Sequence, residues 1–421
     1  MIKKTIKKLD IDFFYEKMDN GLEVFLVPLE FKKIYATFST KYGGKHKSFL
    51  VDNKYVDVPA GMAHFLEHKM FEMESGEAPF EFFSKAGVDC NAYTSFDQTT
   101  YLFQGSRNFY DNLNYLLHYV QSPFLTDENV EKEKGIIEQE IKMCQDIPDY
   151  VLSEKSIEYS FREYPIRHGI TGTVDSVNSI TKESVMFCYN TFYHPSNMFL
   201  VVCGKFDPET VINMVKENQA QKNYSKKSEI VLAKYEESDE VMEEKIVIEK
   251  DVSIPKVGVN FKVNIKGLNI SRFKIETYFN IFRMAKYGWY SDLTKTLHDR
   301  ELIDHELFSS LVFDENYALL MVEYDTNNID ESVILIKEKT LVFDISAELF
   351  ERKKKLILSS YLYSPEQVTQ INNIIMNSII SYNKFDENFM EELEELNYEE
   401  FKEIFEKLNF SHTSTVIVKN K

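Results

Sequence analysis

Two histidines and a glutamate stand together in the five-residue segment HFLEH, which runs from His64 to His68. On a helix, His64 and His68 are residues i and i+4, so both side chains point from one face. Apolar residues around the segment supply the buried side that such a helix needs: Met62, Phe65, Leu66, Met70 and Phe71. Two neutral imidazoles on one helical face can bind one Zn²⁺ ion.

Glu67 precedes the second histidine directly. On a helix it lies close enough to a metal held by His64 and His68 to take a proton from a water molecule there, as a general base. A plainer interpretation also fits, in which the two histidines lie on a half-exposed helix face and Glu67 is a surface charge.

A catalytic zinc usually has three protein ligands and a water, so the segment lacks one ligand. An acidic stretch over residues 128–146 has a helical pattern and offers candidates. Glu133 and Glu140 are seven positions apart, two helical turns on one stripe, whereas Glu138 lies off that stripe. One of the pair can be the third ligand while the other orients a ligand. The alternative is a solvated helix face, which is the usual role of stretches rich in Glu and Lys.

These residues together resemble the M16 (pitrilysin-like, inverzincin) metallopeptidases. The 72 positions between His68 and Glu140 fit the pattern of that family. The resemblance is close in the first half of the chain and weaker in the second. It is strongest to the short bacterial subfamily related to the β subunit of mitochondrial processing peptidase, and within it to the zinc-bearing member of paired Firmicutes peptidases. Further matching segments are residues 91–96, 99–103, 172–173 and 193–198.

The resemblance implies a zinc endopeptidase that cleaves a peptide substrate inside a closed chamber. It implies one Zn²⁺ per chain, bound by His64, His68 and Glu140, with Glu67 as the catalytic base and Glu133 as the residue that orients a ligand.

The resemblance also implies an edge strand on which the substrate lies extended, so that main-chain pairing gives affinity and side-chain pockets give specificity. The alternative for this segment is a plain sheet strand in which Asn91 is a turn residue. The implied strand residues are Asn91, Ala92, Tyr93 and Thr94.

The second half departs from the family where active assemblies carry an Arg and a Tyr that touch the substrate carbonyl. His298 and His305 stand at those positions, and Arg300 is two residues out of register. We therefore expect a homologous M16 subunit to supply the Arg and Tyr in a heterodimer. Alternatives are Arg300 acting with Tyr317 or another Tyr, a homodimer, and a non-catalytic scaffold subunit, against which the intact HFLEH segment counts.

Composition excludes some partners. The net charge of −19 argues against nucleic acid, because phosphate binding needs basic patches. It fits a chamber that attracts basic peptides, and it equally fits a charge that only keeps the protein soluble. No apolar run approaches the roughly 18 residues of a membrane span, so no membrane insertion is expected. Residues 1–12 are basic without the apolar core of a signal peptide, and we expect a cytoplasmic protein.

The order of the elements predicts an α+β fold in each half and a weak internal duplication. The resemblance implies that the two halves are homologous α/β sandwich-like domains, each a mostly antiparallel sheet with helices. The predicted boundaries are residues 1–217 for a metal-bearing domain, 218–244 for a linker, and 245–421 for a domain without the metal motif. Predicted strands lie at 34–42, 99–105, 198–203, 245–265 and 317–325, and predicted helices at 80–86, 108–121, 126–146, 271–286 and 329–339.

Overall fold

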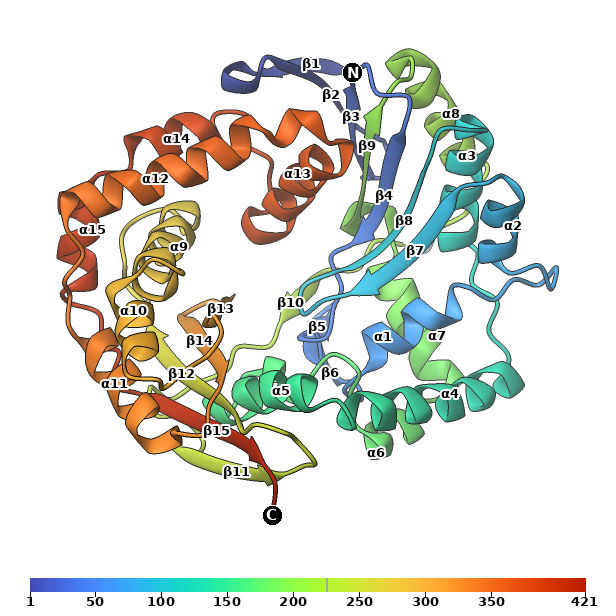
Figure 1. Cartoon of the computed structure of the whole chain (residues 1–421). Coiled ribbons are helices and arrows are strands. Elements are labelled where there is room, and N and C mark those ends of the chain that lie inside the picture. Colours follow the sequence, from blue (N-terminus) through green and yellow to red (C-terminus); the bar gives the residue numbers. More distant parts are fainter. Residues whose placement is uncertain (225) are drawn as a thin grey trace. The chain divides into compact units, whose positions relative to one another are not determined.

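The computed structural model describes residues 1–224 and 226–421 (Figure 1). Ser225, in the predicted linker, lies outside the described residues. The chain forms two compact units that do not follow chain order. Unit 1 consists of Met1–Ile141, His168–Lys234 and Tyr361–Asn388, and unit 2 of Lys142–Arg167, Tyr235–Ser360 and Phe389–Lys421.

A seven-stranded sheet forms the centre of unit 1, in the order β1-β2-β3-β9-β4-β8-β7. All neighbours are antiparallel except β3 and β9, which run parallel. The central strands β4 and β9 are buried along their whole length, as their β-branched and aromatic residues predict. The strands are β1 (Ile2–Ile6), β2 (Ile11–Lys17), β3 (Glu23–Pro28), β4 (Ile34–Thr40), β7 (Asp89–Thr94), β8 (Thr99–Gly105) and β9 (Met198–Gly204).

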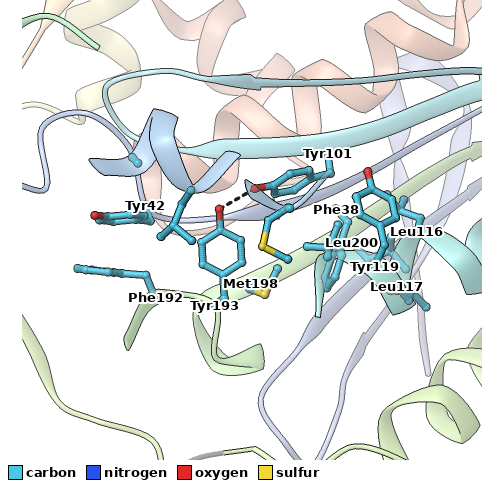
Figure 2. Close-up of a cluster of buried hydrophobic side chains, with 14 of the residues drawn as sticks. Phe38, Tyr42, Tyr101, Leu116, Leu117, Tyr119, Phe192, Tyr193, Met198 and Leu200 are labelled. Carbon is cyan, nitrogen blue, oxygen red and sulfur yellow. Dashed lines mark hydrogen bonds between the residues drawn. The ribbon is translucent and has the colours of Figure 1, made fainter. Parts of the chain in front are cut away.

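Helices cover this sheet, and an apolar core lies between the helices and the sheet. Figure 2 shows part of that core, where the buried hydroxyls of Tyr101 and Tyr193 lie 2.8 Å apart and satisfy each other. The helices of unit 1 are α1 (Met62–Lys69), α2 (Pro79–Lys85), α3 (Phe109–Val120), α4 (Asp127–Gln145, in unit 1 as far as Ile141), α6 (Val174–Asn178), α7 (Lys182–Phe192), α8 (Pro208–Ala220) and α13 (Val368–Tyr382).

Helix α13 joins unit 1 although it comes from the second half of the sequence. Its Asn372 is fully buried, accepts a hydrogen bond from Thr37 Oγ1 at 2.8 Å and donates one to the carbonyl oxygen of Val201 at 3.0 Å. A small three-stranded sheet also belongs to this unit. It consists of β5 (Ser48–Val51), β6 (Lys54–Asp57) and β10 (Ile230–Leu232), the last within the predicted linker.

Unit 2 contains a five-stranded sheet in the order β11-β15-β12-β14-β13, in which only β11 and β15 pair in parallel. Its strands are β11 (Lys245–Glu249), β12 (Lys256–Asn264), β13 (Phe308–Phe313), β14 (Tyr317–Asp325) and β15 (Thr413–Lys419). Its helices are α5 (Pro148–Ser160), α9 (Arg272–Tyr287), α10 (Asp292–Asp299), α11 (Ile329–Leu341), α12 (Ala347–Leu362, in unit 2 as far as Ser360), α14 (Phe389–Glu395) and α15 (Tyr398–Phe405).

Helix α5 comes from the first half of the sequence and packs on the sheet of unit 2. Its Leu152 lies in an apolar cluster with Val252, Val416 and Val418. Gly258 of β12 makes the close approach possible, because a Cβ there would lie 2.7 Å from Ser156 Oγ. The predicted α+β class, with two mostly antiparallel sheets covered by helices, is confirmed. The predicted domain boundaries stay a prediction.

The buried carboxylate of Glu237 bonds the segment after Lys234 to other parts of unit 2. Glu237 accepts hydrogen bonds from the backbone N–H groups of Arg162, Glu163 and Tyr164 at 3.0, 2.7 and 2.9 Å, and from Lys262 Nζ. Neither the Glu237 nor the Lys262 side chain is exposed. Burial opposes ionisation of Glu237, but the pKa of this carboxyl lies below its usual value because Lys262 and the three N–H groups outweigh burial.

Candidate metal centre

The start of helix α1 is fixed by two interlocked glycines. Gly61 caps the helix at φ +87°, and a Cβ there would lie 2.4 Å from the carbonyl oxygen of Thr171. Gly172 has φ +74°, and a Cβ added there would lie 2.5 Å from the carbonyl oxygen of Ala60. Ser176 Oγ donates a hydrogen bond to that carbonyl at 2.9 Å. Only glycine tolerates both conformations and both contacts.

Helix α1 presents His64 and His68 on one side while its apolar residues enter the core. The two imidazole centroids lie 4.6 Å apart, which confirms the i/i+4 geometry predicted from the sequence. His64 is 8% exposed, and its Nδ1 has no hydrogen-bond partner among the described residues. Burial lowers the pKa of His64 to about 3, so this imidazole is neutral at physiological pH and can act as a ligand.

Helix α4 brings Glu133 and Glu140 to these histidines. Glu140 Oε1 lies 3.6 Å from His64 Nε2, and Glu140 Oε2 lies 3.4 Å from His68 Nε2. Glu133, two turns earlier, accepts a hydrogen bond from the other ring nitrogen of His68, Nδ1, at 2.9 Å. Glu140 therefore faces the Nε2 atoms of both histidines, whereas Glu133 contacts Nδ1 of His68.

One atom each from His64, His68 and Glu140 lies within 4.8 Å of the others, and within the described parts of the chain this is the only such group of His, Cys, Asp or Glu residues. Two imidazole nitrogens and one carboxylate oxygen are the donor set of a catalytic zinc site, with room for a fourth ligand. The residues present therefore fit Zn²⁺.

Charges around the site shift the protonation of its other members. Burial alone would lower the pKa of His68, but the hydrogen bond and charge of Glu133, with the charges of Glu140 and Glu67, raise it overall. Burial raises the pKa of Glu67, although the Thr94 hydroxyl and His68 oppose that shift. A carboxyl with a raised pKa suits a general base.

The residues predicted to bind substrate lie in β7, an edge strand that pairs with β8 on one side and has no partner strand on the other within the described residues. Thr94 at its end donates a hydrogen bond from Oγ1 to Glu67 Oε2 at 2.6 Å. Of the other predicted residues, Asn91 is exposed, Ala92 is half-buried, and the Tyr93 hydroxyl lies 3.3 Å from Met376 Sδ.

Sequence reasoning missed Lys69, which lies next to the site and is fully buried. Its Nζ lies 2.8 Å from Glu72 Oε2, 3.6 Å from Glu133 Oε2, and 3.0 Å from the carbonyl oxygen of Asn129. The signal was present in the sequence, because Lys69 falls on the apolar stripe of α1, seven positions after Met62.

The residues singled out in the second half lie in unit 2. His298 is half-buried against Trp289, with ring centroids 5.3 Å apart, and His305 is exposed. Arg300 forms an exposed ion pair with Glu331 at 3.7 Å. Among the described residues, no helix has both the length and the apolar character that crossing a membrane requires.

Comparisons with known proteins found matches over most of the chain. The model of the family described as insulinase (peptidase family M16) matches residues 52–174, and that of the peptidase M16 inactive domain matches residues 179–357. The chain is 39% identical over 372 residues to an uncharacterized zinc protease of Bacillus subtilis, YmfH, covering 86% of each protein.

Solved structures give the same result. The crystal structure of an M16-like peptidase from Alicyclobacillus acidocaldarius has a TM-score of 0.92 at 32% identity, covering 98% of this chain and 99% of that one. A protease from Helicobacter pylori, at 17% identity, shares the fold with a TM-score of 0.82, covering 97% of this chain and 99% of that one. The chain belongs to peptidase family M16, a family of zinc proteases, and the histidines and glutamates of its candidate metal centre all lie in the insulinase-type domain.

Proposed function

We propose that this chain is a zinc endopeptidase that cleaves peptides held as an extended strand, and that it acts as the catalytic subunit of a heterodimer. The observation that carries the proposal is the convergence of His64, His68 and Glu140 from α1 and α4, with Glu67 beside them. In this assignment the first three residues are the zinc ligands, Glu67 is the general base, and Glu133 orients His68.

The geometry supports a separate role for each side chain of the site. When bound, the zinc ion supplies a Lewis acid that polarises the scissile carbonyl and makes water more acidic. Glu67 takes a proton from the attacking water and passes it to the leaving amine. The Thr94 hydroxyl holds Glu67 Oε2 at 2.6 Å, so that the other carboxylate oxygen is presented to the water.

The edge strand supports an extended substrate. The edge of β7 that has no partner strand among the described residues, from Asn91 to Thr94, offers main-chain groups that a peptide can pair with as an added strand. Because Thr94 lies at the end of β7 and contacts Glu67, a peptide paired along this strand passes the general base. A peptide in extended form is therefore the substrate class that suits the site.

The heterodimer part of the proposal rests on the second half of the chain, where His298 and His305 stand at the positions of the family's Arg and Tyr. A homologous M16 subunit that supplies these two side chains would complete carbonyl binding. We further propose that the assembly works in the cytoplasm.

The test uses the purified chain together with the second M16 protein of the same genome. We expect one zinc ion per chain, cleavage of a quenched-peptide library, loss of cleavage on chelation, and recovery when zinc is restored. His68→Ala should abolish zinc binding. A wild-type protein that binds no zinc, or a zinc-loaded assembly that cleaves no peptide in the library, would overturn the proposal.

A further inference from the structure

Lys69 is a buried cation in an otherwise apolar helix face. Its side chain is 0% exposed, although lysine is almost never fully buried unless it is paired. Taking an ammonium group out of water is unfavourable, so its partners must compensate the lost hydration. The partners are Glu72 at 2.8 Å, Glu133 at 3.6 Å and the carbonyl oxygen of Asn129 at 3.0 Å.

Glu133 is shared between Lys69 and the metal centre. Its Oε2 faces Lys69 Nζ, while its Oε1 accepts the hydrogen bond from His68 Nδ1 at 2.9 Å. The opposite ring nitrogen of His68 lies 3.4 Å from Glu140, within the candidate metal centre. Two consecutive residues of α1 thus hold the two oxygens of one carboxylate from α4, and this carboxylate is only 6% exposed.

We propose that Lys69 is a positioning residue of the metal centre. Its ammonium group fixes the rotation of the Glu133 carboxylate, so that Oε1 accepts the hydrogen bond of His68 Nδ1 and the ring presents Nε2 to the metal. The inference rests on the proposed function, because it takes His68 to be a zinc ligand. Residues that orient a ligand in this way typically change metal affinity by about 10- to 100-fold when they are removed.

The test is a double-mutant cycle on zinc affinity. The zinc Kd is measured by chelator competition for wild type, Lys69→Met, Glu133→Gln and the double variant. Lys69→Met keeps the aliphatic volume and removes the charge, and we expect it to weaken zinc binding about 10- to 100-fold. In the Glu133→Gln background the same change should have little further effect, because Lys69 acts through Glu133.

Two further variants separate positioning from general stability. Lys134→Met removes a neighbouring lysine whose ion pair is with Glu131 at 2.5 Å, and should leave the zinc Kd unchanged. Lys69→Gln removes the charge but keeps a donor for Asn129, so it serves if Lys69→Met does not fold, and should weaken zinc binding to a similar extent. Urea unfolding of each metal-free protein confirms that the compared variants are folded.

A wild-type zinc Kd in the folded Lys69 variant would overturn the inference. So would a full multiplicative effect of Lys69→Met in the Glu133→Gln background, because Lys69 would then act independently of that carboxylate. The proposed function fails separately, when wild type binds zinc in this competition assay yet its assembly cleaves no peptide.

Discussion

The catalytic assignment at the residue scale depends on Glu67, because this carboxylate lies beside the three proposed ligands without being one of them. We expect Glu67→Gln to keep wild-type zinc content and to lower kcat about 10²- to 10⁴-fold, since the amide cannot accept the proton of the attacking water. Zinc content and peptide cleavage are measured on the same preparation. Glu131→Gln, on an exposed position of α4, is the matched control. Retained activity in Glu67→Gln would contradict the assignment of the base.

Thr94 donates a 2.6 Å hydrogen bond from its hydroxyl to Glu67, and we propose that this bond orients the carboxylate. Thr94→Val keeps the shape and removes that donor, and a hydrogen bond to a charged group is worth about 1.5–3 kcal/mol. We expect kcat to fall about 10- to 100-fold with zinc affinity unchanged. Thr94→Ser keeps a hydroxyl and should retain most of the activity. Equal kinetics in the Val and Ser variants would show that the hydroxyl has no role in catalysis.

At the scale of elements, the site depends on how helix α1 begins. Gly61→Ala places a Cβ 2.4 Å from the backbone oxygen of Thr171 at a φ of +87°, so both the contact and the conformation are unfavourable. We expect the free energy of unfolding to fall by about 2 kcal/mol or more, and zinc binding to weaken with it. Denaturant unfolding and zinc titration measure the two effects.

Gly135→Ala is the matched control for that prediction. Gly135 lies in helix α4 between Glu133 and Glu140, and a Cβ there meets nothing within 4 Å. Alanine should therefore stabilise the protein by about 1 kcal/mol through its higher helix propensity. If both glycine variants change stability equally, the interlocked start of α1 is not the cause.

The spacing of apolar residues in the sequence predicted helices α1 and α4, which hold the residues of the candidate metal centre. The pattern could not show that α13 packs on the sheet of unit 1 and α5 on that of unit 2, since these contacts join residues hundreds of positions apart. Lys69 and Glu237 were missed for a related reason. A charged residue is expected at the surface, and only the fold shows which partners make its burial possible.

At the scale of the whole molecule, the proposed zinc ligands belong to unit 1, and His298 and His305 belong to unit 2. Within unit 2, His298 packs on Trp289 and His305 is exposed. Arg300 is engaged with Glu331. The proposal that a second subunit binds the carbonyl rests on residue type, because imidazoles stand where the resemblance places Arg and Tyr.

We therefore expect the isolated chain to bind zinc but to cleave peptides poorly, and the second M16 protein to restore cleavage. Missing fixed donors for the developing oxyanion cost about 3 kcal/mol, which is about a hundredfold in rate. The measurement compares kcat/KM for the lone chain and for the mixture, with a His298→Ala/His305→Ala double variant in each. If the lone chain cleaves well, is unchanged by the second protein, and loses nothing in the double variant, then the chain is self-sufficient and its carbonyl-binding residues lie elsewhere.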